Sequence, residues 1–224
     1  MRIASALMVV MLGTALAAQE GAATLPSNYK VTFENAWVKV TSVRYEGKQK
    51  LPGHTHTPNP AAYVYLNDGP PVIFTHVGGK PATRAATKAG AFRVYRGLDE
   101  VHEVENTGAA PSEFLRVELK TTPLEPGSFF GKFERPASPS GAPVVHFNHS
   151  QLRVSRLWIQ PGQELGVTTT TEPALIIALA PGAGLRTGET RWVAASSAER
   201  LKNTSSAAID VLRFDLRTQP KKIS

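Results

Sequence analysis

The sequence contains no cysteine, which excludes disulfide bonds, thiolate metal ligands and cysteine nucleophiles. Beyond its first twenty residues it also has no apolar run long enough to span a membrane. No segment keeps a 3.6-residue hydrophobic period over several turns, so we do not expect long amphipathic helices. Motifs such as G-x-S-x-G, the P-loop and G-x-G-x-x-G are absent as well. We therefore expect β structure, and any chemistry must use side chains other than cysteine.

The N-terminus has the pattern of a secretory signal peptide. Arg2 precedes an apolar stretch over residues 3–16, and Ala15-Leu16-Ala17 forms an A-x-A cleavage pattern. We therefore predict a signal peptide over residues 1–18, cleaved near Ala17 or Ala18, and a periplasmic or secreted protein without a membrane span after cleavage. The alternative is an uncleaved N-terminal anchor.

The positive charge of the chain is spread along the sequence. The formal net charge is +7, and the basic residues occur singly or in pairs such as Lys221 and Lys222. No basic run interleaved with aromatic residues is present, which is the pattern that follows a phosphate backbone. We therefore expect no nucleic-acid partner, and at most a weak attraction to anionic molecules.

The remaining segments are typical of β-strands. They are short, rich in β-branched and aromatic residues, and separated by Gly, Pro, Asn or Asp. The clearest are VKVTSVRY, AYVYL, PVIFTHV, AFRVY, VHEVEN and EFLRVELK. Many short strands at regular spacing predict an all-β sandwich or barrel.

The chain also repeats its own pattern. VTFENAWVKV at residues 31–40 resembles VHFNHSQLRV at 145–154, and NTGAAPSEFLRVELK at 106–120 matches NTSSAAIDVLRFDLR at 203–217 without a gap. Between them, AYVYLNDG matches the segment that ends at Gly182. Three matches in the same order indicate a tandem duplication with shorter loops in the second copy. We expect β domains over residues 28–121 and 144–218.

Residues 122–143 separate the two copies and are rich in proline, glycine and serine, as linkers are. Phe129, Phe130 and Phe133 lie within this segment. Because three freely exposed phenylalanines would be costly, we expect them to dock on one of the domains.

Three histidines in the first copy are candidate metal ligands. His54 and His56 are two positions apart, so in an extended chain their side chains point to the same face. His102 follows in another strand-like stretch, which can neighbour the first in a small barrel. A polar pair at a solvated strand end is the alternative for His54 and His56.

These residues resemble the two motifs of the cupin superfamily. Gly47, His54-Thr55-His56 and Gly69 resemble the first motif with one extra residue, and Gly90 with His102-x3-Asn106 resembles the second. The proline and second glycine of the second motif are displaced or absent. Because the resemblance covers both copies, it implies a bicupin, two tandem double-stranded β-helix (jelly-roll) barrels with a metal inside the first.

The first copy departs from the family's ligand set, because Ala62 occupies the position that we count as the family's glutamate. A three-histidine site at His54, His56 and His102 remains, and neutral imidazole suits Fe, Zn, Ni, Mn or Cu without distinguishing them. Such a site keeps positions open for water, dioxygen or substrate. Three-histidine cupins include thiol dioxygenases and diketone-cleaving enzymes.

The second copy has no histidine at the ligand positions, where Thr169, Thr171 and Glu199 stand instead. We expect it to bind no metal and to be a degenerate cupin. We expect the other histidines to be structural or solvated; they are His76, His146 and His149. For His76 the alternative is a position in the pocket or next to the metal ligands. Arg93 would meet an anionic substrate only if it faced inward, and we expect it to face outward.

The sequence therefore predicts an exported bicupin that binds a divalent transition metal and a small, anionic molecule. A dioxygenase-like or an isomerase- or lyase-like enzyme is one interpretation. The alternatives are a non-catalytic small-molecule-binding protein and a structural bicupin, because no general acid or base stands out in the first barrel. A homodimer is compatible with the resemblance.

Overall fold

The computed structural model describes residues 25–99, 101–137 and 142–221. The predicted signal peptide, residues 1–18, lies outside them. The described residues form seventeen β-strands and one short 3-10 helix, η1 (Pro126–Ser128). Within these ranges no helix combines the length and the apolar character needed to cross a membrane. The all-β prediction is confirmed.

The first barrel consists of two antiparallel sheets. The larger has the order β1 (Tyr29–Glu34), β2 (Val38–Tyr45), β9 (Ser112–Leu119), β4 (Ala61–Tyr65), β7 (Phe92–Tyr95), β10 (Phe130–Phe133). The smaller has the order β3 (Lys50–His54), β8 (His102–Asn106), β5 (Val72–His76), β6 (Ala82–Arg84). Strands adjacent in the chain often lie in opposite sheets, as in a jelly roll.

The second barrel repeats this plan with fewer strands. Its larger sheet has the order β11 (Val144–Asn148), β12 (Leu152–Ile159), β17 (Ile209–Leu216), β14 (Ala174–Ala178), β15 (Thr190–Val193). Its smaller sheet pairs β13 (Glu164–Thr168) with β16 (Ala198–Lys202). The prediction of two tandem jelly-roll barrels is confirmed.

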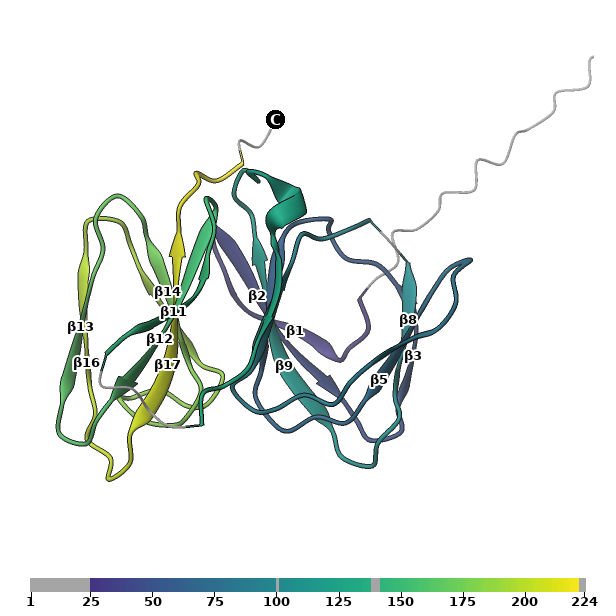
Figure 1. Cartoon of the computed structure of the whole chain (residues 1–224), viewed down its shortest axis with the longest axis horizontal. Coiled ribbons are helices and arrows are strands. Elements are labelled where there is room, and N and C mark those ends of the chain that lie inside the picture. Colours follow the sequence, from purple (N-terminus) through teal and green to yellow (C-terminus); the bar gives the residue numbers. More distant parts are fainter. Residues whose placement is uncertain (1–24, 100, 138–141, 222–224) are drawn as a thin grey trace, which may run out of the picture.

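The four sheets form four layers, with the two larger sheets packed against each other in the middle (Figure 1). One apolar cluster fills the space between them and draws from both barrels, with Val40, Leu115 and Val117 from the first and Val154 and Phe214 from the second. Separate clusters fill the interiors of the second and the first barrel. The middle strands β9 and β17 are therefore buried on both faces.

The two barrels share details of strand register and side-chain hydrogen bonding, as expected for an internal repeat. β1 and β11 each have a register shift at the same place, between Val31 and Phe33 and between Val145 and Phe147. In each copy an asparagine pins a turn. Asn106 Nδ2 donates to the carbonyl of Ala110 at 2.9 Å, and Asn203 Nδ2 donates to that of Ala207 at 2.7 Å.

The segment expected as a linker, residues 122–143, contains both η1 and β10. β10 pairs with β7 and so extends the larger sheet of the first barrel. Phe129 is completely buried, and Phe133 stacks on Phe92 with ring centroids 4.8 Å apart. Phe130 is 73% exposed, because alternate residues of an edge strand point to opposite faces. Two of the three phenylalanines thus dock as expected.

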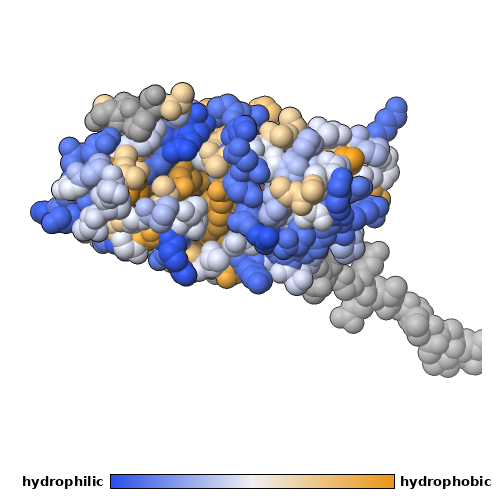
Figure 2. All heavy atoms as spheres, turned by 90° about the horizontal axis from the view of Figure 1, so that it is seen from below, coloured by the Kyte–Doolittle hydropathy of each residue, from blue (hydrophilic) through white to orange (hydrophobic). Residues whose placement is uncertain are grey.

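Most of the surface drawn in Figure 2 is hydrophilic, with its larger hydrophobic areas in the middle of the molecule. Many exposed charges are neutralised by ion pairs across neighbouring strands. Lys50 Nζ, for example, lies 2.9 Å from a carboxylate oxygen of Glu103, and Arg200 lies 2.7 Å from Glu164. These ion pairs between neighbouring strands agree with the scattered charge of the sequence.

Candidate metal centre and cavity

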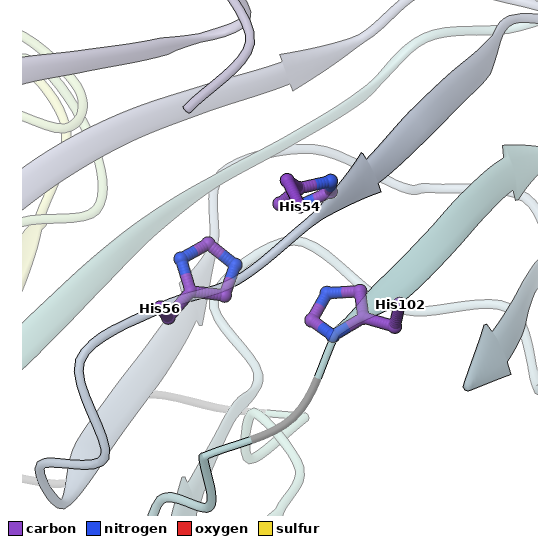
Figure 3. A group of neighbouring side chains, drawn as sticks. All are labelled: His54, His56 and His102. Carbon is purple, nitrogen blue, oxygen red and sulfur yellow. The ribbon is translucent and has the colours of Figure 1, made fainter. Parts of the chain in front are cut away.

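The three predicted histidines meet inside the first barrel (Figure 3). His54 ends β3 and His102 begins β8, and the two residues face each other in the antiparallel register of these strands. His56 follows in the loop after β3 and turns its ring toward both. One nitrogen from each ring lies within 4.8 Å of the other two. The prediction that these residues share one place is therefore confirmed, although the strand itself stops at His54.

The surroundings keep these imidazoles neutral. Burial lowers the pKa of His56 to about 2, with the positive charge of Arg116 as the next contribution. Burial also lowers the pKa of His102 to about 3, assisted by His54, and it lowers the pKa of His54. A neutral imidazole offers a free nitrogen lone pair, which is the form that binds a metal.

The tautomer of His54 follows from its hydrogen bonds. Its Nδ1 lies 2.9 Å from the carbonyl oxygen of Pro52. Because a carbonyl only accepts, Nδ1 must carry the proton, which leaves the lone pair on Nε2. This backbone contact orients the ring in the way that outer hydrogen bonds orient metal-binding histidines.

His102 supplies a further sign that the group fits a metal. Its Nδ1 is buried and has no hydrogen-bond partner within the described part of the chain. Buried polar atoms without partners are costly and rare, so such an atom at a cluster of lone pairs indicates room for another ligand. Nitrogen ligands at neighbouring positions of one ion lie about 2.9–3.4 Å apart, so the rings must move closer by about 1 Å or more at the widest pair when an ion binds.

Tyr29 of β1 closes the centre on one side. Its hydroxyl lies 2.9 Å from Nε2 of His54 and 2.7 Å from the hydroxyl of Tyr45. Its ring centroid is 5.1 Å from those of His54 and His56. Burial raises the pKa of Tyr29 well above its usual value, so the phenol is protonated and donates to Nε2.

A cavity of about 60 Å³ extends from the histidines into the first barrel. One water molecule needs roughly 10–15 Å³, so the cavity has room for a small molecule. Aromatic rings form much of its wall, and among them are Tyr63, Tyr65, Phe74, Tyr95 and Phe114. Tyr63 and Tyr65 face the cavity because they alternate with Ala62 and Val64, which point to the other side of β4.

This alternation corrects the position that we counted as the family's glutamate. Ala62 is completely buried in the apolar layer between the barrels, so no side chain at that position could reach the histidines. The neighbouring positions of β4, Ala61 and Tyr63, lie on the inner face. Counting back from Gly69 gave Ala62, whereas counting forward from His56 past four intervening residues gives Ala61, which lies on the inner face.

Two arginines face the cavity without an anionic partner among the described residues. The guanidinium carbon of Arg84 lies 3.7 Å from the ring centroid of Phe74, and that of Arg93 lies 4.2 Å from that of Tyr63. Nε of Arg93 is buried and has no hydrogen-bond partner within the described residues. Burial and the charge of Arg93 lower the pKa of Arg84 to about 10, which still leaves it charged at neutral pH. The expectation that Arg93 faces outward is therefore wrong.

A third arginine, Arg116 on β9, is neutralised. It forms a buried ion pair with Glu118, which also accepts hydrogen bonds from Thr57 and Asn59 at 2.7 Å each. These contacts outweigh burial and lower the pKa of Glu118. Glu118 is thus a fixed carboxylate that positions Arg116 and the loop after His56.

The remaining histidines lie beside the metal centre or at structural contacts. His76 faces His102 across β5 and β8, with ring centroids 5.6 Å apart, so it packs against one of the three candidate ligands. His146 lies against Phe92 at the contact between the barrels, and His149 is hydrogen-bonded to Ser128. Both have structural surroundings, as expected.

The second barrel has no comparable centre in the part of the chain that the structure describes. Thr169 donates its hydroxyl to the carbonyl of Ser197 at 3.0 Å, and Glu199 accepts from Arg191 at 2.7 Å. Apolar side chains such as Ile176 and Leu201 fill the interior.

Sequence reasoning missed Tyr29, Arg84 and Arg116 as cavity residues. Arg116 repeats as Arg213 in the second copy, and each lies two residues before an acidic partner. This shared pattern was visible in the sequence but did not indicate whether the arginine side chains point into the barrel. Tyr29 and Arg84 have no sequence signal, because only the sheet pairing brings them to the histidines.

No family model matches the chain, and no curated protein matches its sequence. Solved structures do match. The protein Ylba from E. coli aligns with a TM-score of 0.63 at 9% identity, covering 90% of this chain and 89% of its own. A cupin 2 conserved barrel domain protein from Leptotrichia buccalis aligns with a TM-score of 0.52 at 9% identity, covering 84% of this chain and 88% of its own.

An enzyme is also among these matches. Salicylate 1,2-dioxygenase from Pseudaminobacter salicylatoxidans aligns with a TM-score of 0.54 at 12% identity, covering 80% of this chain and 71% of the enzyme. At these identities the likeness concerns the fold alone. The chain accordingly has the cupin fold, and its first barrel holds a three-histidine group of the kind that binds a metal.

Proposed function

We propose that this protein is a metal-dependent dioxygenase-like cupin that acts on a small anionic molecule, with an aromatic carboxylate as the best candidate. One observation carries the proposal. Two imidazoles of the three-histidine group, His56 and His102, line the same aromatic cavity as two arginines that have no anionic partner among the described residues. A metal at the histidines would supply the site where dioxygen and substrate are activated.

The side chains of the cavity have separate tasks in this proposal. His54, His56 and His102 hold a divalent transition metal. Arg84 and Arg93 bind the anionic group of the substrate, since a guanidinium pairs with both oxygens of a carboxylate. The aromatic wall excludes water and packs against an apolar ring. The fold likeness to salicylate 1,2-dioxygenase, which was also solved with gentisate adducts, supports this substrate class.

The test is ligand binding and oxygen uptake by the iron-loaded protein. Salicylate and gentisate serve as probes, and phenol and hydroquinone serve as matched molecules without the carboxylate. We expect binding of the acids only, and loss of about tenfold or more in their affinity in Arg84→Gln and Arg93→Gln, since a hydrogen bond to a charged group contributes about 1.5–3 kcal/mol. Equal binding of the uncharged molecules would contradict the anionic substrate.

A protein that binds its ligand without turnover is the second candidate, because Glu118, the one carboxylate that lines a pocket together with a histidine among the described residues, is held in an ion pair. Oxygen uptake separates the two candidates. Binding of the acids without oxygen uptake or product would favour the non-catalytic protein.

Export and the role of the second barrel also belong to the proposal. The N-terminal sequence pattern supports cleavage near Ala17 or Ala18 and release into the periplasm or the medium. N-terminal sequencing of the mature protein tests this, and an intact Met1 would contradict it. The apolar filling of the second barrel supports a degenerate cupin that serves the fold.

A further inference from the structure

Three imidazoles leave the charge of a bound divalent ion uncompensated, and the carboxylate of the family motif is missing here. Within the described residues, Tyr29 is the one cavity tyrosine whose hydroxyl meets an imidazole nitrogen. Tyr29 comes from β1 in the larger sheet, whereas His54 and His102 come from β3 and β8 in the smaller sheet. The hydroxyl therefore approaches the imidazole nitrogens from the opposite side of the barrel.

The distance between Tyr29 and His54 is that of two ligands on one ion. Ligand atoms held about 2.0–2.1 Å from a metal at neighbouring positions are about 2.9–3.4 Å apart. Tyr29 Oη lies 2.9 Å from Nε2 of His54, and Nε2 carries the lone pair because Nδ1 donates to Pro52.

Metal binding also removes the present partner of this hydroxyl. Nε2 of His54 has a single lone pair, so it cannot accept the proton of Tyr29 and bind a metal at once. Tyr29 is then a buried hydroxyl that must find another acceptor. Tyr45, whose hydroxyl is 2.7 Å away and whose side chain is buried, can turn its own proton toward Tyr29 Oη and stabilise an oxygen that binds a cation.

We propose that Tyr29 is the fourth protein ligand of the metal, through its phenolate oxygen, and takes the place of the missing carboxylate. The proton of the phenol passes to solvent when the ion binds, as happens for other protein ligands. This inference rests on the proposed metal centre. It adds a ligand from a strand that the cupin motifs do not include.

The test is the spectrum of the ferric protein. The full-length mature protein is loaded with ferrous ion and oxidised, and iron content is measured beside the absorption spectrum. A tyrosine bound to ferric iron gives a visible charge-transfer band, and resonance Raman excitation in that band enhances the vibrations of the phenolate ring. Tyr29→Phe keeps the ring and removes only the oxygen. Tyr95→Phe makes the same change elsewhere on the cavity wall.

We expect the wild type and Tyr95→Phe to show the band, and Tyr29→Phe to lose it completely while still binding iron, at about tenfold lower affinity or worse. Iron bound by the wild type without the band, or an unchanged band in Tyr29→Phe, would overturn the role of Tyr29 and leave the metal centre standing. A wild type that binds no iron would overturn both. If Tyr29→Phe fails to fold, iron-loaded wild type without phenolate vibrations would still overturn the proposal, and their persistence in Tyr95→Phe would exclude that cavity tyrosine as their source.

Discussion

At the scale of single residues, the candidate site is a set of charges and lone pairs held in a dry barrel. His54, His56 and His102 stay neutral because burial penalises their charged forms. Arg84 of the same cavity remains charged at neutral pH, because burial lowers its pKa only to about 10. The site thus combines lone pairs for a cation with positive charge for an anion.

The lowered histidine pKa values make stability depend on pH in the metal-free protein. In the unfolded chain His56 and His102 bind protons below about pH 6.5, whereas in the folded chain they do so only near pH 2–3. The unfolded state therefore binds more protons between these values, and the free energy of unfolding falls as pH falls. Each of the two histidines contributes about 1.4 kcal/mol, so between pH 7.5 and pH 5.5 we expect a loss of about 3 kcal/mol.

Urea unfolding of chelator-treated protein at both pH values measures this loss. The double variant His56→Gln/His102→Gln is the matched control, because its side chains do not titrate, and its pH dependence should be flatter than that of the wild type. A wild type and a double variant with the same pH dependence would contradict the assignment.

At the scale of the elements, β10 joins the segment between the repeats to the first barrel. Phe133 stacks on Phe92, whereas Phe130 on the opposite face of the same strand is mostly exposed. We expect Phe133→Ala to lower the free energy of unfolding by about 2 kcal/mol, less than for a fully buried phenylalanine. Phe130→Ala should cost about 0.5 kcal/mol or less. Denaturant unfolding measures both, and equal losses would contradict docking through Phe133.

The elements also show how far the sequence predicts the structure. Alternating apolar residues and turn signals predict most strands, and the repeat predicts their pairing into two similar barrels. β10 was missed because proline and glycine surround it, and its pairing with β7 depends on contacts distant in sequence. Tyr29 and Arg84 were missed for the same reason, whereas His54, His56 and His102 were found through their motif spacing.

At the scale of the whole molecule, the two barrels share a core. Strands β9 and β17 are buried on both faces, and the apolar cluster between the larger sheets includes residues of each copy. Polar contacts cross the same interface, where the buried Arg156 donates to the carbonyl of Gly90 and the half-exposed Arg135 pairs with the buried Asp210 at 2.8 Å. The sequence predicted two domains but could not show that their sheets face each other.

A shared core predicts cooperative unfolding of both barrels. We expect a single calorimetric transition, with equal calorimetric and van't Hoff enthalpies, because exposing either barrel would uncover the apolar face of the other. Two separate transitions, or a calorimetric enthalpy about twice the van't Hoff value, would show that the barrels unfold independently.

The central claim is that the three histidines of the first barrel bind a metal. Elemental analysis of the untagged mature protein from its native compartment tests it most directly, beside the double variant His54→Ala/His102→Ala and the control His149→Gln. We predict about one equivalent of a transition metal in the wild type and the control, and none in the folded double variant. No metal in any of them after reconstitution, or equal metal in all three, would contradict the account.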